Sequence, residues 1–124
     1  MIDANSERAT ILLAHGSRDP LWRRPIEAVA DRIRQLSPAT RVRCAYLENT
    51  APDPDTSSAE LVQLGARHIT IVPLFLGIGK HARDDLPVLL TRLKASHPQV
   101  AFDLRPTIGE EAQIIELIAR IALS

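Results

Sequence analysis

Two histidines stand at equivalent places in this sequence, each shortly after an apolar stretch. His15 follows the run ATILLA, and His81 follows the apolar segment 68–72 after a short loop with two glycines. Glu48 comes directly after a third such stretch, RVRCAYL. An imidazole has a pKa of about 6.5, so it can accept a proton near neutral pH. Two imidazoles and one carboxylate can also bind a divalent first-row metal and leave positions open for a substrate.

The residues around His81 add features that suit a large, flat ligand. The glycines of the loop let such a ligand approach the backbone, and the other loop side chains are apolar. Three nearby cations could bind carboxylates of the ligand. The residues expected to contact it are Arg18, Gly77, Gly79, Lys80 and Arg83. The sequence therefore predicts a site for an anionic, metal-binding substrate beside an apolar wall.

Strand and helix patterns alternate along the chain, and these elements must position the histidines. Short stretches that are apolar or alternate with a period of two predict strands at 9–14, 41–47, 68–72 and 100–104. Apolar residues at helical spacing predict helices at 21–36 and 84–96. A shorter helix is expected after a loop at 48–58 and ends at Leu64. A last helix carries an apolar stripe of Ile114, Leu117, Ile118 and Ile121. Pro87 is expected in the first turn of the third helix. Asp84 and Asp85 are expected to favour that helix start through its dipole rather than to bind metal.

This alternation predicts an α/β fold, a three-layer sandwich on a four-stranded parallel sheet. The first and third strands are apolar throughout and belong in the centre, whereas the second and fourth alternate and belong at the edges. With right-handed crossovers, these constraints give the strand order 2-1-3-4. The crevice between the first and third strands is then the topological switch point, where open α/β sheets bind ligands. We therefore expect His15 and His81 to line one crevice, with Glu48 on the same rim.

Length and composition bound the domain organisation and the partners. The chain has 124 residues, the size of one domain, which we assign to 9–124 after a flexible N-terminus at 1–8. Lys+Arg and Asp+Glu both number 15, and this balance argues against nucleic-acid binding. Cys44 is the single cysteine, so no intrachain disulfide can form, which fits a cytoplasmic protein. No apolar run approaches the roughly 18 residues of a membrane span, so no membrane partner is expected.

Three motifs in order carry a family resemblance. They are LLAHGSRDP at 12–20, AYLE at 45–48 and PLFLGIGKHARDDLP at 73–87. With them the chain resembles the small-form sirohydrochlorin cobaltochelatases and ferrochelatases, which are class II, ATP-independent tetrapyrrole chelatases. The separations among His15, Glu48 and His81 match that family as well, and the resemblance spans nearly the whole chain.

The resemblance implies a fold, an activity and roles for residues. It implies the chelatase-like sandwich and the insertion of Co²⁺ or Fe²⁺, sometimes Ni²⁺, into sirohydrochlorin, with no cofactor beyond the metal that is inserted. His15 and His81 match the catalytic histidines of the family, and Glu48 matches the acidic residue that joins them as a metal ligand. Longer members contain two such halves in tandem, which implies that this chain forms a homodimer.

Other interpretations of the same residues stay open. His15 could be a loop residue that satisfies only backbone groups, and His81 could be only the N-terminal residue of a helix. Glu48 could be a solvated strand end or a cap. His68 and His97 are expected to be structural or exposed. A metal carrier without enzymatic activity could use the same histidines. A phosphate-binding module is disfavoured, because a GxxxxGK[ST] loop would place Gly at position 74 and Ser or Thr at position 81, where this chain has leucine and histidine.

Overall fold

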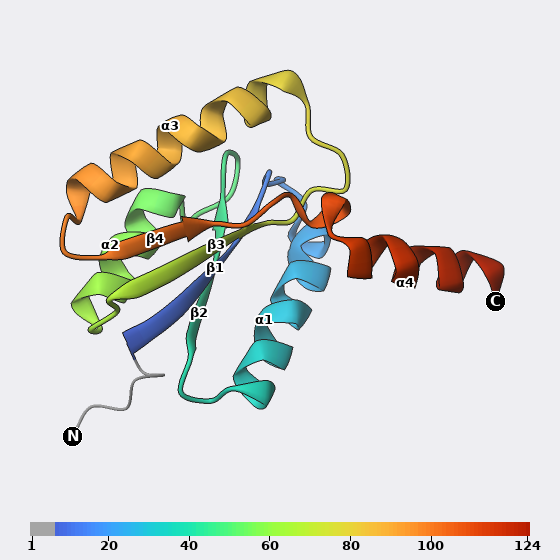
Figure 1. Cartoon of the computed structure of the whole chain (residues 1–124), viewed down its shortest axis with the longest axis horizontal. Coiled ribbons are helices and arrows are strands. Elements are labelled where there is room, and N and C mark those ends of the chain that lie inside the picture. The colour runs from blue at the N-terminus through green and yellow to red at the C-terminus, as the bar shows by residue number, and fades with distance from the viewer. Residues whose placement is uncertain (1–6) are drawn as a thin grey trace.

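The computed structural model describes residues 7–124 (Figure 1). The flexible N-terminus expected at 1–8 falls mostly on residues 1–6, which lie outside the described part. Arg8 already belongs to the first strand. The first strand therefore begins one residue earlier than the sequence pattern indicates.

Four parallel strands form one sheet in the order β2-β1-β3-β4, and this confirms the predicted topology. They are β1 (Arg8–Ala14), β2 (Arg41–Tyr46), β3 (His68–Pro73) and β4 (Ala101–Leu104). In the register of the sheet, Leu12 of β1 lies opposite Cys44 of β2 and Val72 of β3. The apolar strands occupy the centre because helices cover them, while the alternating strands form the edges.

Helices cover both faces of the sheet and give the three layers (Figure 1). On one face lies α1 (Arg24–Leu36), which follows a 3-10 turn at Pro20–Arg23, and its Ala30 packs with Leu12 and Val42. On the other face lie α2 (Pro54–Gln63) and α3 (Lys80–Ser96). The larger core beneath them includes Ile11, Leu13, Leu61, Ile69, Ile71, Leu89 and Leu93.

The start of α2 differs from the expected loop at 48–58. Asp53 caps the helix, because its carboxylate accepts a hydrogen bond of 2.7 Å from the backbone N–H of Thr56. Pro54 occupies the first helical position, where its missing N–H costs nothing. The predicted loop is therefore too long, since its C-terminal part already forms the first turn and a half of α2.

The start of α3 also lies about one turn before the predicted start at Asp84. Gly79 is the N-cap of α3 and offers no side chain to signal the boundary. Pro87 consequently lies inside the helix, and the prediction that it occupies the first turn is wrong. The first turn of α3 contains no acidic residue, so the expected dipole role of Asp84 and Asp85 is wrong as well.

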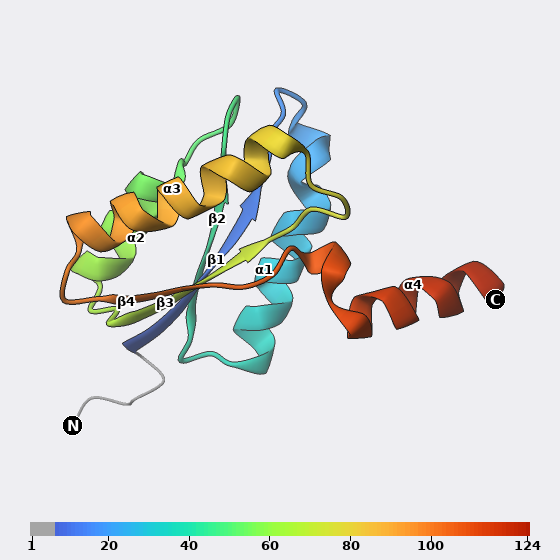
Figure 2. The same cartoon turned by 45° about the horizontal axis from the view of Figure 1, so that its top comes forward.

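The last helix, α4 (Ala112–Leu123), does not return to the sheet. It follows a 3-10 turn at Ile108–Glu110 and projects away from the body of the molecule in both views (Figures 1 and 2). None of its residues is buried, although most of them are apolar. Among residues 7–124, no helix has the length and apolar content needed to cross a bilayer.

Candidate metal-binding site

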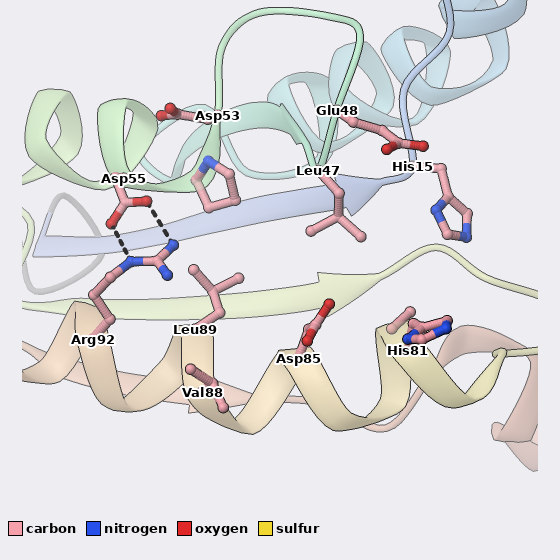
Figure 3. Close-up of a pocket in the computed structure, with 12 residues that line it drawn as sticks. His15, Leu47, Glu48, Asp53, Asp55, His81, Asp85, Val88, Leu89 and Arg92 are labelled. Carbon is pink, nitrogen blue, oxygen red and sulfur yellow. Dashed lines mark hydrogen bonds and ion pairs between the residues drawn. The ribbon is translucent and has the colours of Figure 1, made fainter.

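One cavity of about 530 Å³ brings the predicted donor residues together. His15 follows β1, Glu48 lies just past β2, and His81 lies on α3, and all three side chains line this cavity (Figure 3). The cavity lies at the carboxyl edge of the sheet, where parallel strands place the loops that bind ligands. The expected meeting of the two histidines and Glu48 at one crevice is confirmed.

Backbone hydrogen bonds join the loops that carry His15 and Glu48. The N–H of Leu47 donates to the carbonyl of Ala14 at 3.0 Å, and the N–H of Glu48 donates to the carbonyl of His15 at 2.9 Å. These bonds continue the β1–β2 ladder past the ends of both strands. The imidazole and the carboxylate are therefore carried by one continuous wall of the cavity.

Gly16 allows this close approach. Its φ is +107°, a conformation that side chains with a Cβ rarely adopt, and an added Cβ would lie 1.7 Å from the carbonyl oxygen of Glu48. Thr50 fixes the same junction, because its Oγ1 accepts from the N–H of Ser17 at 3.0 Å and donates to the carbonyl of Ser17 at 2.6 Å. The role of Thr50 could not be predicted from the sequence, since its contact with Ser17 joins residues 33 positions apart in the chain.

The imidazole of His15 lies against the ring of Phe75. The two ring centroids are 4.6 Å apart and the planes are inclined by 51°. Phe75 is itself buried in the main core, with 4% of its surface exposed. One side of the imidazole is therefore positioned by the apolar loop after β3, while the residue as a whole stays exposed to the cavity.

His81 approaches the cavity from the opposite wall. It is the second residue of α3, and the helix is held down by buried Ala82, Leu86 and Leu89. This anchoring leaves the imidazole exposed on the face of α3 that looks toward His15 (Figure 3). The site is therefore a cleft with one histidine on each side.

Four carboxylates lie among the residues that line the cavity, and only that of Glu48 was predicted as part of the site. Besides Glu48, the carboxylates of Asp53, Asp55 and Asp85 line the cavity, against a single Lys or Arg, Arg92, among the described lining residues. Asp53, Asp55 and Arg92 were not predicted as site residues, and Asp85 was expected to act on the helix dipole instead. Asp53 and Asp55 lie at the N-cap and in the first turn of α2, and Asp85 and Arg92 lie two turns apart on one face of α3.

Asp55 and Arg92 join α2 to α3 at one end of the cavity. The guanidinium donates twice to the carboxylate, from Nε at 3.0 Å and from Nη2 at 2.8 Å. The hydrogen bond to Asp55 raises the pKa of Arg92 above its ordinary value. Asp53 caps α2 nearby, and hydrogen bonding by Thr56 lowers the pKa of the Asp53 carboxyl.

The donors stand apart in this conformation. Within residues 7–124, no three His, Cys, Asp or Glu side chains lie close enough together to hold a metal ion. His15, Glu48 and His81 are all exposed, so no tight packing fixes their rotamers. The two walls thus offer donors across an open cleft, and side-chain rotation is the movement that could bring them to one ion.

The residues predicted to contact a substrate lie outside this cavity. Lys80 pairs with Asp84, with Nζ and Oδ2 3.0 Å apart, and Arg83 lines a neighbouring cavity of about 400 Å³. An added Cβ at Gly77 or Gly79 would meet no atom within 4 Å, so their backbone is open to an approaching ligand. Arg18 is exposed on the loop after His15. None of these five residues lines the cleft itself.

The remaining histidines have partners elsewhere in the fold. Nε2 of His68 lies 2.7 Å from Oδ2 of Asp103, on the adjacent strand of the sheet. The ring of His97 lies near Phe102, with centroids 6.2 Å apart. Neither histidine lines the cleft, which agrees with the structural roles expected for them.

The parallel sheet covered by helices on both faces places the protein in the class of open α/β folds. A histidine on each side of the switch point puts its candidate site where such folds bind ligands. Within this class, the chain belongs to the CbiX family, whose model matches residues 9–122.

Individual relatives agree with this assignment. The chain is similar to the sirohydrochlorin cobaltochelatase of Methanococcus aeolicus, with 33% identity over 82 residues that cover 66% of this chain and 57% of that protein. It is 25% identical over 112 residues to the sirohydrochlorin ferrochelatase of Bacillus subtilis, covering 90% of this chain and 43% of that protein. The chain thus spans about half the length of these curated relatives.

A solved structure matches the fold over nearly the whole chain. It is that of a CbiX protein from Marinobacter aquaeolei VT8, assigned to cobalamin (vitamin B12) biosynthesis. The TM-score is 0.80 at 33% sequence identity, and the match covers 94% of both chains.

Proposed function

We propose that this protein inserts a divalent metal, Co²⁺, Fe²⁺ or Ni²⁺, into sirohydrochlorin without ATP and without a further cofactor. The observation that carries the proposal is the placement of His15, Glu48 and His81 around one cavity. Membership of the CbiX family and similarity to sirohydrochlorin cobaltochelatases and ferrochelatases support the choice of substrate and of Co²⁺ or Fe²⁺. Ni²⁺ is included from the sequence resemblance alone.

The two walls of the cleft divide the chemistry between them. His15 and His81 bind the metal from opposite sides, and Glu48 supplies negative charge and a third donor. As the metal enters the ring, two pyrrole N–H protons leave, and the two imidazoles accept them. The metal moves to the tetrapyrrole because four ring nitrogens replace a smaller number of protein ligands. The products are the metallated ring and two protons, and the exchange requires no ATP because the ring binds the metal more strongly than the protein does.

The charges around the site favour different positions for the metal ion and for the tetrapyrrole. The cavity carries an excess of carboxylates, which attracts a cation and repels the acidic side chains of a tetrapyrrole. Arg18, Lys80 and Arg83 lie outside it. We place the carboxylates of the tetrapyrrole against these cations and the ring over the open backbone of Gly77 and Gly79, with its centre facing the histidines.

A spectroscopic assay tests this function. The purified protein is mixed anaerobically with sirohydrochlorin and Co²⁺ or Fe²⁺, and the absorption change is compared with that of the metal alone. We expect the wild-type protein to accelerate the change, and His15→Ala and His81→Ala each to return the rate to the background. The matched control His68→Ala removes an imidazole outside the cleft and should keep the activity.

Two results would contradict the proposal. Turnover that survives in His15→Ala refutes the assignment of this histidine. Tight Co²⁺ binding with no acceleration by the wild-type protein favours a metal carrier instead of an enzyme.

We also propose that the protein is a cytoplasmic homodimer. The single cysteine, Cys44, leaves no possibility of an intrachain disulfide, which suits a reducing compartment. α4 supports the dimer, because Ile115, Leu117 and Ile121 expose 55%, 53% and 65% of their surface on a helix with no buried residue. A second copy of this chain is the occupant to which we assign this apolar surface.

A further inference from the structure

Asp85 lies on the same wall of the cleft as His81. The two residues are four apart on α3, so their side chains project from the same face of the helix. Both line the cavity, and the carboxylate of Asp85 points from α3 toward the opposite wall (Figure 3). Asp85 is in the second turn of α3, too far from the helix start for its charge to serve as a dipole partner.

The neighbouring charges leave Asp85 available. Asp84, the adjacent carboxylate, is paired with Lys80 at 3.0 Å. Arg92, the one Lys or Arg among the described lining residues, is held by two hydrogen bonds from its guanidinium to Asp55. Among the residues that the structure describes, Asp85 has neither a hydrogen bond nor an ion pair. A carboxylate that faces the cavity and pairs with no cation among the described residues is a suitable donor for a divalent metal.

Each wall of the cleft then presents one imidazole and one carboxylate. The wall formed by the loops after β1 and β2 carries His15 and Glu48, and α3 carries His81 and Asp85. Two carboxylates balance the charge of a divalent cation, and two imidazoles complete a set of four donors. All four residues are exposed, so their side chains can rotate toward one ion.

We infer that Asp85 is a further ligand of the metal substrate, bound together with His81 before the metal is transferred. This inference rests on the proposed function, since the metal is the one destined for the tetrapyrrole. Asp85 holds the metal on α3 while the tetrapyrrole approaches from the mouth of the cleft. It is released with the other protein ligands when the ring nitrogens take the metal.

The test is Co²⁺ binding by the intact protein in the absence of tetrapyrrole, measured by calorimetry. Asp85→Asn keeps the shape of the side chain and removes its charge, and we expect Co²⁺ to bind it about tenfold or more weakly than the wild-type protein. Asp84→Asn is the matched control, because it removes the same charge from the adjacent residue. We expect the control to bind Co²⁺ within about twofold of wild type, since its exposed ion pair contributes little.

Insertion kinetics give a second readout. We expect Asp85→Asn to raise the KM for the metal and to leave the KM for sirohydrochlorin unchanged. The melting temperature should stay at the wild-type value, because Asp85 has no partner in the described fold. His81→Ala serves as the positive control for lost metal binding.

The outcomes separate this inference from the proposed function. Equal Co²⁺ affinities of Asp85→Asn and wild type, with His81→Ala impaired, overturn the role of Asp85 and leave the chelatase proposal intact. Equal losses in Asp85→Asn and Asp84→Asn overturn it too, because they indicate a general charge effect. Absence of Co²⁺ binding by the wild-type protein also overturns it. A Co²⁺ site that depends on Asp85 in a protein that inserts no metal refutes the proposed function alone.

Discussion

At the scale of single residues, Gly16 holds the site together. Its positive φ and its contact with the Glu48 carbonyl leave no room for a side chain. We predict that Gly16→Ala lowers the free energy of unfolding by about 2 kcal/mol or more, through backbone strain and displacement of the Glu48 loop. Urea denaturation measures the loss. The insertion rate should fall as well, because Glu48 shifts relative to His15.

Gly77→Ala is the control for this prediction. An added Cβ at Gly77 would meet no atom within 4 Å, so its stability should stay within about 0.5 kcal/mol of wild type. Similar losses in the two variants would show that the contact at Gly16 is not the cause. The sequence indicated a turn at Gly16, but the partner could not be predicted, because Glu48 comes close only when β1 and β2 pair.

The donor residues illustrate the same limit. His15, Glu48 and His81 could be predicted because each follows a recognisable strand, and parallel strands bring their carboxyl ends to one edge. Asp85 could not, because its role depends on where α3 begins. A start at Asp84 would make Asp85 a residue of the first turn, whereas with the start at Lys80 it belongs to the second turn, and its side chain lines the cleft.

At the scale of elements, the cap of α2 makes stability depend on pH. Hydrogen bonding by Thr56 lowers the pKa of Asp53 in the folded state relative to the unfolded chain. A lowered folded pKa stabilises the protein above the unfolded value of about 3.9, and this contribution is lost as pH falls through the folded pKa. We predict that Asp53→Ala costs about 1 kcal/mol at neutral pH, the usual value of a helix N-cap.

Asp53→Asn separates the cap from its charge. Asparagine caps a helix about as well as aspartate but does not titrate. Wild type and Asp53→Asn should therefore have similar stability at pH 7, and wild type should lose stability relative to the variant below about pH 4. Denaturation curves that stay parallel across this range would contradict the assigned role of Asp53.

The elements were predictable where a side chain signals their bounds. Each strand bound agrees with its prediction to within one residue, because the apolar or alternating pattern of the sequence ends where the strand ends. The helix starts were less predictable. The N-cap of α2 is Asp53, which lies in a loop with several other residues that can cap a helix. The N-cap of α3 is Gly79, which has no side chain to form a capping hydrogen bond.

At the scale of the whole molecule, the topology followed from the sequence but the course of α4 did not. The contrast between apolar and alternating strands was enough to order the sheet. The helix predicted from the apolar stripe of Ile114, Leu117, Ile118 and Ile121 is confirmed. Periodicity indicates that such a face is buried, but it does not say whether the covering surface belongs to the same chain.

We predict that α4 joins two copies of the chain. Ile118 lies on its apolar face, and Gln113 lies on its polar side, so Ile118→Glu and Gln113→Glu add one charge to different faces of the same helix. Light scattering after size-exclusion chromatography should give a dimer for wild type and Gln113→Glu and a monomer for Ile118→Glu. The melting temperature of the monomeric variant should fall only through lost association, because α4 has no buried residue in its own chain. A monomeric wild-type protein at micromolar concentration, or a dimer that survives Ile118→Glu, would show that a second copy does not cover this helix.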